Sequence, residues 1–155
     1  MSYLIVGASS GLGRELAYSF AKNKNDLILI SRDDRDLASI KNDLEIKYKV
    51  NVTTIDINFG NLDEIDQKLF IEKKIFENLD GALFPIGLMF DADNIQLEKD
   101  KINELINANY LSICYTISRY IKESKNKNIS IVGFGSVSGL LGRNINSYYA
   151  SSKRA

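Results

Sequence analysis

Short apolar runs alternate with longer amphipathic stretches throughout this sequence, and that alternation limits the fold more than any other feature. The short runs are typical of strands buried on both faces, and the longer stretches are typical of surface helices. Between residues 34 and 48, Leu37, Ile40 and Leu44 recur at spacings of three and four, as on one face of a helix. Strands are therefore predicted at Tyr3–Val6, Asp26–Ser31, Val50–Asp56, Gly81–Phe84 and Ile129–Phe134, and helices at about 11–22, 34–48, 62–77 and 99–123.

This order of elements predicts a Rossmann-like α/β fold with a doubly wound parallel sheet. The length of 155 residues suits a single domain, 1–155, that is large enough to bury a substantial core. Ligands of such sheets bind beyond the carboxyl ends of the strands. Binding residues are therefore expected directly after each strand.

Composition narrows the classes of partner. Lysine plus arginine and aspartate plus glutamate number 20 each, so the charge balance gives no electrostatic reason to expect a nucleic acid or an anionic membrane. A single cysteine, Cys114, and the absence of histidine argue against a disulfide and a metal site. No apolar run approaches the ~18 residues of a membrane span, and no charged segment precedes the first run as in a signal peptide. A cytoplasmic protein with a small-molecule partner is expected.

A glycine-rich bend follows the first predicted strand, between Gly7 and Gly13, and helix-forming residues come directly after it. Backbone N–H groups at the start of a helix are unsatisfied and lie at the positive end of its dipole, so they attract phosphate groups. An ordinary strand-to-helix turn is the alternative, which the position of this bend disfavours. The residues expected to hold a pyrophosphate are Gly7, Ser9, Ser10, Gly11, Leu12 and Gly13.

The end of the second strand bears on the choice of nucleotide. An acidic residue there hydrogen-bonds the ribose 2′-hydroxyl of NAD and repels a 2′-phosphate. This sequence has Ser31 at that point and Arg32 after it, a planar donor suited to phosphate. Asp33 and Asp34 follow closely, and a solvated Arg32 is the alternative. The pattern favours NADP(H) over NAD(H).

Tyr149 and Lys153 are four residues apart, which places a phenol and an ammonium group on one face of a helix. An ammonium ion beside a phenol favours the ionised form, so the phenol exchanges protons more readily near neutral pH. Ser136 precedes Tyr149 by 13 residues and follows a predicted strand. Its hydroxyl is suited to donating to a substrate carbonyl oxygen, whereas the alternative is a serine in a turn.

Asn109 interrupts an apolar stripe on the predicted helix 99–123. A buried amide without partners costs about 1–3 kcal/mol, so this residue needs a structural or functional reason. A kink in the helix or a hydrogen bond between helices is the structural alternative. Asn107 is expected to face solvent. The apolar positions of the stripe are Ile102, Ile106, Ile113, Ile117 and Tyr120.

The glycine spacing G-x-x-x-G-x-G, the Tyr149–Lys153 pair and the position of Ser136 together resemble the short-chain dehydrogenases/reductases, from Gly7 to Lys153. The resemblance implies an oxidoreductase that transfers a hydride between NADP(H) and a small carbonyl or alcohol substrate. It implies Tyr149 as general acid/base, supported by Lys153, which also binds the nicotinamide ribose, while Ser136 polarises the carbonyl. It further implies that Asn109 holds a water for a proton relay.

The resemblance extends to the third and fourth strands, with one departure. Asp56 is expected to face the adenine amino group, and Ile57 to flank the ring. After the fourth strand the family commonly has Asn-Asn-Ala-Gly, and this sequence has Phe84-Pro85-Ile86-Gly87, of which only Gly87 matches. Pro85 donates no backbone hydrogen bond, so we expect a rearranged sheet centre. The departure also keeps a second interpretation open, a catalytically silent NADP(H)-binding or scaffold protein. The glycine spacing disfavours the sugar-nucleotide branch of the family.

Complete members of the family have further strands and a substrate loop beyond the tyrosine and lysine. The sequence is therefore interpreted as C-terminally truncated, with a sheet that is incomplete at its C-terminal edge. An exposed fifth strand is expected, and Tyr149 and Lys153 are expected within the first turn of a helix, where helix ends fray. Relatives pair through the helices that carry Asn109 and Tyr149, so a homodimer or homotetramer is expected of the full-length form.

Overall fold

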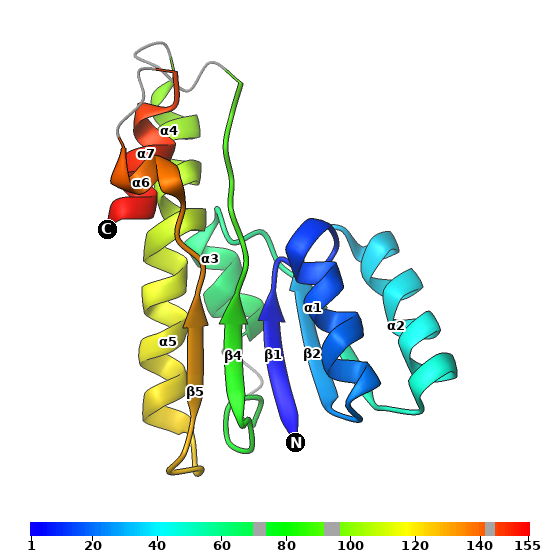
Figure 1. Ribbon diagram of the computed structural model, residues 1–155. Helices are drawn as coiled ribbons and strands as arrows, with labels where there is room; N and C mark the ends of the chain where they lie inside the picture. The colour runs from blue at the N-terminus through cyan, green and yellow to red at the C-terminus, as the bar shows by residue number, and fades with distance from the viewer. Residues whose placement is uncertain (70–73, 92–96, 142–144) are drawn as a thin grey trace.

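A five-stranded parallel sheet forms the centre of the protein (Figure 1). The computed structural model describes residues 1–69, 74–91, 97–141 and 145–155. The strand order is β3-β2-β1-β4-β5, which confirms the doubly wound α/β prediction. Each strand begins and ends within two residues of its predicted bounds. The strands are β1 (Ser2–Val6), β2 (Asp26–Ser31), β3 (Val52–Asp56), β4 (Gly81–Phe84) and β5 (Ser130–Gly133).

Alternate residues of the central strands enter two separate cores. In β1, Leu4 and Val6 belong to the core on one face of the sheet, and Ile5 belongs to the core on the other. Successive side chains of a strand point to opposite faces, so strands that are apolar throughout require helices on both sides. Those helices are present on both faces (Figure 1).

The helices form two layers around the sheet and a cap above it (Figure 1). One layer consists of α1 (Gly11–Lys22) and α2 (Asp34–Tyr48). The other consists of α3 (Leu62–Glu64) with the π-helical segment η1 (Ile65–Leu69), and of one long helix made of α4 (Lys99–Ile106), the π-helical segment η2 (Asn107–Leu111) and α5 (Ser112–Glu123). Two helices, α6 (Val137–Leu140) and α7 (Ser147–Arg154), lie beyond the carboxyl end of β5.

The helix predicted at 62–77 is wrong in its last part, since residues 74–78 form a turn; residues 70–73 lie outside the described part. Tertiary contacts explain the difference. The carbonyl of Glu77 accepts a hydrogen bond from the N–H of Lys125 at 3.0 Å, and its carboxylate pairs with the Lys125 ammonium at 2.6 Å. The buried ring of Phe76 packs against Tyr120.

Two further expectations are wrong. The sheet centre is not rearranged, because Leu83 pairs with Ile5 on one side and with Val132 on the other, and Pro85 follows the last strand residue, where no ladder bond is required. The helix of Tyr149 and Lys153 is also longer than expected. It has two turns, begins at Ser147 and holds Tyr149 in its first turn and Lys153 in its second.

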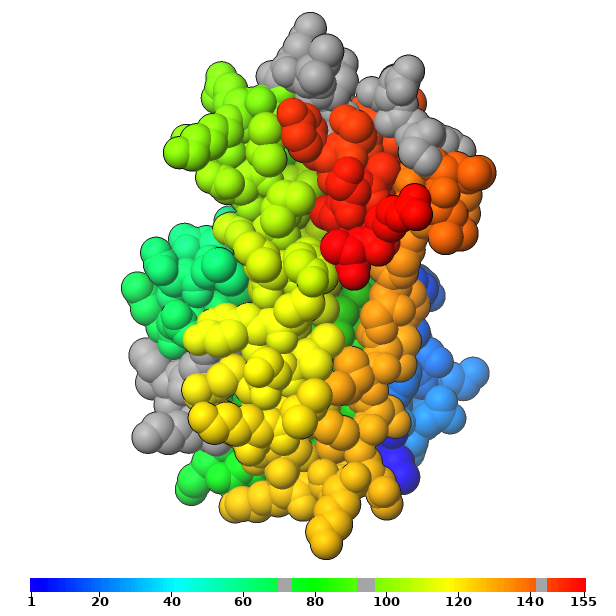
Figure 2. Space-filling view, turned by 90° about the vertical axis from the view of Figure 1, so that its left-hand side faces the viewer, coloured from blue at the N-terminus to red at the C-terminus, as the bar shows by residue number. Residues whose placement is uncertain are grey.

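The outer edge of β5 is exposed, as expected. All four of its residues are exposed, and within the described ranges β5 pairs only with β4. Figure 2 shows β5 at the surface beside α5, with α7 packed against the upper part of the long helix. The helices of the described residues include none long and apolar enough to cross a membrane.

Candidate active site

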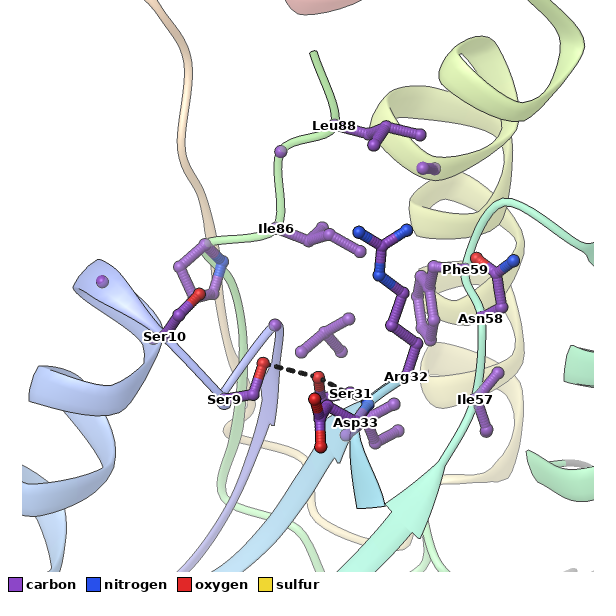
Figure 3. A pocket seen from close by; sticks show the side chains of 18 of the residues that line it. Ser9, Ser10, Ser31, Arg32, Asp33, Ile57, Asn58, Phe59, Ile86 and Leu88 are labelled. Carbon is purple, nitrogen blue, oxygen red and sulfur yellow. Dashed lines mark hydrogen bonds between the residues drawn. The ribbon is translucent and has the colours of Figure 1, made fainter. Parts of the chain in front are cut away.

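A cleft of about 430 Å³ opens at the carboxyl ends of the strands (Figure 3). It lies where the sheet order changes direction, between β1 and β4, which is the position at which doubly wound sheets bind ligands. Its walls come from the segments that follow β1, β2, β3 and β4. The cleft is lined by Val6, Gly7, 9–13, 30–33, Asp36, 57–60, 85–88 and Ala108.

The bend after β1 forms one wall and requires glycine at two positions. Gly7 has a φ of +88°, a conformation that other residues rarely adopt. A Cβ atom on Gly13 would lie 2.0 Å from the carbonyl oxygen of Gly7, so only glycine allows the helix to pass so close to the strand. The N–H groups of Gly7 and Ala8 both donate to the carbonyl of Ile30, at 2.8 and 3.1 Å, and fix the bend on β2.

The N-terminus of α1 faces this cleft without an anionic cap. Ser10 precedes the helix and makes no capping hydrogen bond through its side chain to a described residue, and the first turn contains no acidic side chain. The N–H groups of a first turn are unsatisfied by the helix itself and carry partial positive charge. This wall is therefore suited to a phosphate group.

The end of β2 forms a corner with the same bend. The Ser31 hydroxyl donates to the Ser9 hydroxyl at 2.7 Å, and the Arg32 side chain points into the cleft between Ile86 and Phe59 (Figure 3). One guanidinium nitrogen of Arg32 lies 4.0 Å from the Glu104 carboxylate, and the Arg32 side chain is 66% exposed. The guanidinium therefore has room to meet an anion in the cleft.

After β3 the structure separates two residues that were predicted together. Ile57 is buried and lines the cleft, whereas Asp56 is exposed and is not among the lining residues. The Lys68 ammonium donates to the Asp56 carboxylate at 2.8 Å, and this hydrogen bond holds the pKa of that carboxyl below its usual range. The contact of Asp56 with an adenine amino group remains a prediction.

Lys153 is anchored on the segment after β4, which forms one wall of the cleft. Its ammonium group donates to the carbonyl of Ile86 at 2.8 Å and to that of Phe134 at 3.2 Å. Burial lowers the pKa of this lysine. Tyr149 lies beside it, because a Cβ atom on Gly87 would be 3.7 Å from the Lys153 ammonium and 3.9 Å from the Tyr149 hydroxyl. The pair therefore faces Gly87, a residue of the cleft wall.

Ser136 lies on the same side of the molecule as this pair. It is the N-cap of α6, and its hydroxyl accepts from the N–H of Ser138 at 3.2 Å. Ser136 and Lys153 both line a second hollow of about 440 Å³. Ser138 instead accepts a hydrogen bond from the amide of Asn146 at 3.3 Å.

Asn109 connects the cleft wall to α7, the helix that carries Tyr149 and Lys153. Its amide oxygen accepts from the N–H of Leu88 at 2.7 Å, and its amide nitrogen donates to the carbonyl of Leu88 at 2.8 Å. The same nitrogen donates to the Ser152 hydroxyl at 3.0 Å, which in turn donates to the carbonyl of Tyr149 at 2.8 Å. The side chain therefore makes the inter-helix hydrogen bond that the sequence left open as an alternative; a water for proton relay remains a prediction.

Asn109 occurs within the π-helical segment η2, and such segments are frequent at functional sites. The expectation that Asn107 faces solvent is wrong. Asn107 is half-buried, and its amide donates to the carbonyl of Gly60 at 3.1 Å. The extra residue in this turn lets both asparagines of one helix reach loops that follow different strands.

Some site residues were missed in the sequence. Asn58, Phe59 and Gly60 line the cleft, and their position after a strand was a usable signal. Ile86 acts through its carbonyl and Ser152 through a bond to a distant helix, and neither contact leaves a signature in the sequence.

The fold is a doubly wound α/β sheet with a cleft at its switch point, and a tyrosine–lysine pair lies beside one wall of that cleft. The sequence matches the family model for short chain dehydrogenases over residues 2–155. The chain belongs to the short-chain dehydrogenase family.

Named relatives support this assignment. The chain is 32% identical over 157 residues to an NADP-dependent 3-hydroxy acid dehydrogenase of Schizosaccharomyces pombe, covering 98% of this chain and 60% of the relative. It is 29% identical over 158 residues to a very-long-chain 3-oxoacyl-CoA reductase of Danio rerio, covering 97% of this chain and 49% of the relative. The chain therefore spans about half to three fifths of the length of these two proteins.

Solved structures show the same fold. A ketone-specific alcohol dehydrogenase from Comamonas testosteroni superimposes with a TM-score of 0.90 at 21% identity, over 99% of this chain and 61% of that one. A short-chain dehydrogenase from Sphingobium yanoikuyae, solved with NADPH, superimposes with a TM-score of 0.85 at 23% identity, over 99% and 60% of the two chains.

Proposed function

We propose that this chain forms the nucleotide-binding and catalytic part of an NADP(H)-dependent oxidoreductase that interconverts a carbonyl and an alcohol. The observation that carries the proposal is the position of Lys153. Its ammonium group is held on the carbonyl of Ile86, in the segment after β4 that lines the cleft. Lys153 and Tyr149 are thereby held beside Gly87, on the wall of the cleft that follows β4.

The residues of the cleft fit a dinucleotide. The close approach of Gly13 to Gly7 brings the N-terminus of α1 to the cleft wall, which suits a pyrophosphate. Ile57 and Gly87 line the remaining walls, and Arg32 extends into the cleft, where its guanidinium is suited to a 2′-phosphate. When bound, the nicotinamide ring supplies or accepts the hydride.

The proton chemistry falls to the residues of this chain. Tyr149 protonates the carbonyl oxygen during reduction and recovers the proton in the reverse direction. The ammonium of Lys153 favours the phenolate of Tyr149 by its charge, and a hydrogen bond from Ser136 stabilises negative charge on the substrate oxygen. Asn109 keeps the helix of Tyr149 fixed to the cleft wall through Ser152 and Leu88.

Binding and turnover test the proposal separately. Titration of the 155-residue chain with NADPH, followed by nucleotide fluorescence, should show saturable binding. The natural gene product should then be assayed for NADPH oxidation with 3-oxoacyl compounds and simple ketones, and for NADP⁺ reduction with 3-hydroxy acids, the chemistry named for two relatives. Binding without turnover across a broad carbonyl panel would instead favour a silent nucleotide-binding protein, and absence of binding would contradict both.

A further inference from the structure

Arg14 lies at the corner of the cleft where β2 ends, although it is not one of the lining residues. It occupies the first turn of α1, and its side chain turns back toward the glycine bend. The Arg14 Nε–H donates to the carbonyl of Ser9 at 2.9 Å, and a terminal nitrogen donates to the same carbonyl. This terminal nitrogen is also 3.6 Å from the Asp36 carboxylate.

Without Arg14, the charged residues near the end of β2 would not favour the binding of an anion. Among the lining residues that the structure describes, the charged ones are Arg32, Asp33 and Asp36, one base against two acids. Arg32 is additionally within 4.0 Å of the Glu104 carboxylate. A phosphate bearing close to two negative charges would be repelled by both aspartates. The guanidinium of Arg14 offsets Asp36 at the point where that repulsion is expected.

Ser9 connects Arg14 to the nucleotide-selective end of β2. Its carbonyl accepts from Arg14, and its hydroxyl accepts from Ser31, the residue at the position where an acid would select NAD. A guanidinium has five N–H donors in a fixed plane, so two bonds to Ser9 leave others for an anion. Both side chains of the Arg14–Asp36 pair are about half exposed, at 43% and 50%, and the pair is therefore easily exchanged.

We propose that Arg14 is a second specificity-determining cation for the 2′-phosphate, and that Asp36 is the counter-charge which the phosphate replaces. The proposal rests on the NADP(H)-binding function proposed above and adds a residue that the end of β2 alone does not indicate. Arg32 meets the phosphate from the strand, and Arg14 meets it from the helix.

Four variants of the 155-residue chain test this inference, with the dissociation constants of NADPH and NADH measured by nucleotide fluorescence and calorimetry. Arg14→Gln should weaken the binding of NADPH about tenfold more than the binding of NADH, because a charge-assisted hydrogen bond to the phosphate is lost. Arg14→Lys should recover part of the preference. Asp36→Asn should act in the opposite direction and raise the preference for NADPH by up to about fivefold, the range of an exposed ion pair. Arg35→Gln, on the exposed surface of α2, is the matched control for loss of one positive charge.

The outcomes separate the two proposals. A wild-type chain that binds NADPH no better than NADH contradicts the proposed NADP(H) function itself, and it also contradicts the role proposed for Arg14. A wild-type preference that survives unchanged in Arg14→Gln, or that falls equally in Arg35→Gln, overturns only the role of Arg14. If Arg14→Gln does not fold, Arg14→Lys decides the question, because lysine keeps the charge but lacks the planar set of donors: a lower preference for NADPH than in the wild type supports the role of Arg14, and an unchanged preference overturns it.

Discussion

At the scale of single residues, the site depends on side chains whose neighbours are far away in the sequence. Lys153 contacts the carbonyl of Ile86, 67 positions earlier, and so brings the α7 helix to the segment after β4. Tyr149 and Lys153 share the neighbour Gly87, where a Cβ atom would lie within van der Waals contact of both groups.

Replacement of Tyr149 by phenylalanine tests its role as a proton donor. The substitution removes the hydroxyl and keeps the ring, so NADPH affinity should change little while turnover of the natural gene product should fall by a factor of about 10²–10⁴, the usual contribution of general acid–base catalysis. Tyr148→Phe is the matched control, because it removes a hydroxyl from the neighbouring residue of the same helix. Steady-state kinetics that show equal losses in both variants would remove Tyr149 from this role.

Tyr120 provides a pH-dependent prediction. It is fully buried, and its hydroxyl donates to the carbonyl of Leu79 at 3.0 Å; burial raises its pKa to about 12. The unfolded chain loses this proton near pH 10, whereas the folded chain keeps it until about pH 12. The free energy of unfolding should therefore fall by roughly 1–3 kcal/mol as pH rises between these values, because the unfolded chain ionises at Tyr120 first. In urea unfolding across that pH range, Tyr120→Phe should lose less free energy of unfolding than the wild type. Equal slopes of this free energy against pH in the two proteins would contradict the prediction.

At the scale of elements, the π-helical segment η2 determines which loops the long helix contacts. Asn109 joins the segment after β4 to α7, and Asn107 binds the carbonyl of Gly60 in the segment after β3. Each bond fixes a loop that lines the cleft. Two walls of the cleft are therefore hydrogen-bonded to one irregular turn of the long helix.

Replacement of Asn109 by alanine should destabilise the protein more than the matched change at Asn107. The first substitution removes three hydrogen bonds, two to the half-buried backbone of Leu88 and one to the buried Ser152 hydroxyl, and a buried polar group left unsatisfied costs about 1–3 kcal/mol. Asn107→Ala removes one bond to a half-buried carbonyl. Urea unfolding of both variants gives the comparison, and an equal loss in the two would show that the Asn109 contacts contribute little.

At the scale of the whole molecule, the two edge strands of the sheet differ in the side chains that they expose. Within the described residues β3 pairs only with β2 and β5 only with β4, but β5 exposes the apolar side chains of Ile131 and Val132. Unpaired backbone groups and apolar side chains at a sheet edge favour pairing with another chain.

The 155-residue chain should therefore associate as its concentration rises, through β5. Val132→Lys should reduce this association, because a charged side chain on an edge strand opposes strand pairing. Ile121→Lys, at an exposed apolar position of α5, is the matched control on a helix surface. Light scattering coupled to size-exclusion chromatography gives the mass of each variant. If only Ile121→Lys suppresses the self-association, the contact between chains lies on α5 and not on β5.

Regular elements were largely predictable from the sequence, and irregular ones were not. The strands and the helices α1 and α2 were predicted within two residues, because apolar periodicity and glycine position reflect local geometry. The turn at residues 74–78 was predicted as helix, because its backbone is held by Lys125. The π-helical segment was also invisible, since the apolar stripe of the helix continues on both sides of it.

The sequence by itself determined the parallel sheet, the glycine-rich bend after β1 and the spacing of Tyr149 and Lys153. These depend on steric and hydrogen-bonding rules that act within a few residues. Only the tertiary structure decided that Lys153 meets the carbonyl of Ile86, that Asn109 binds Leu88 and Ser152, and that Asp56 turns away toward Lys68. Contacts between distant residues depend on strand order, register and helix packing, which no local pattern records.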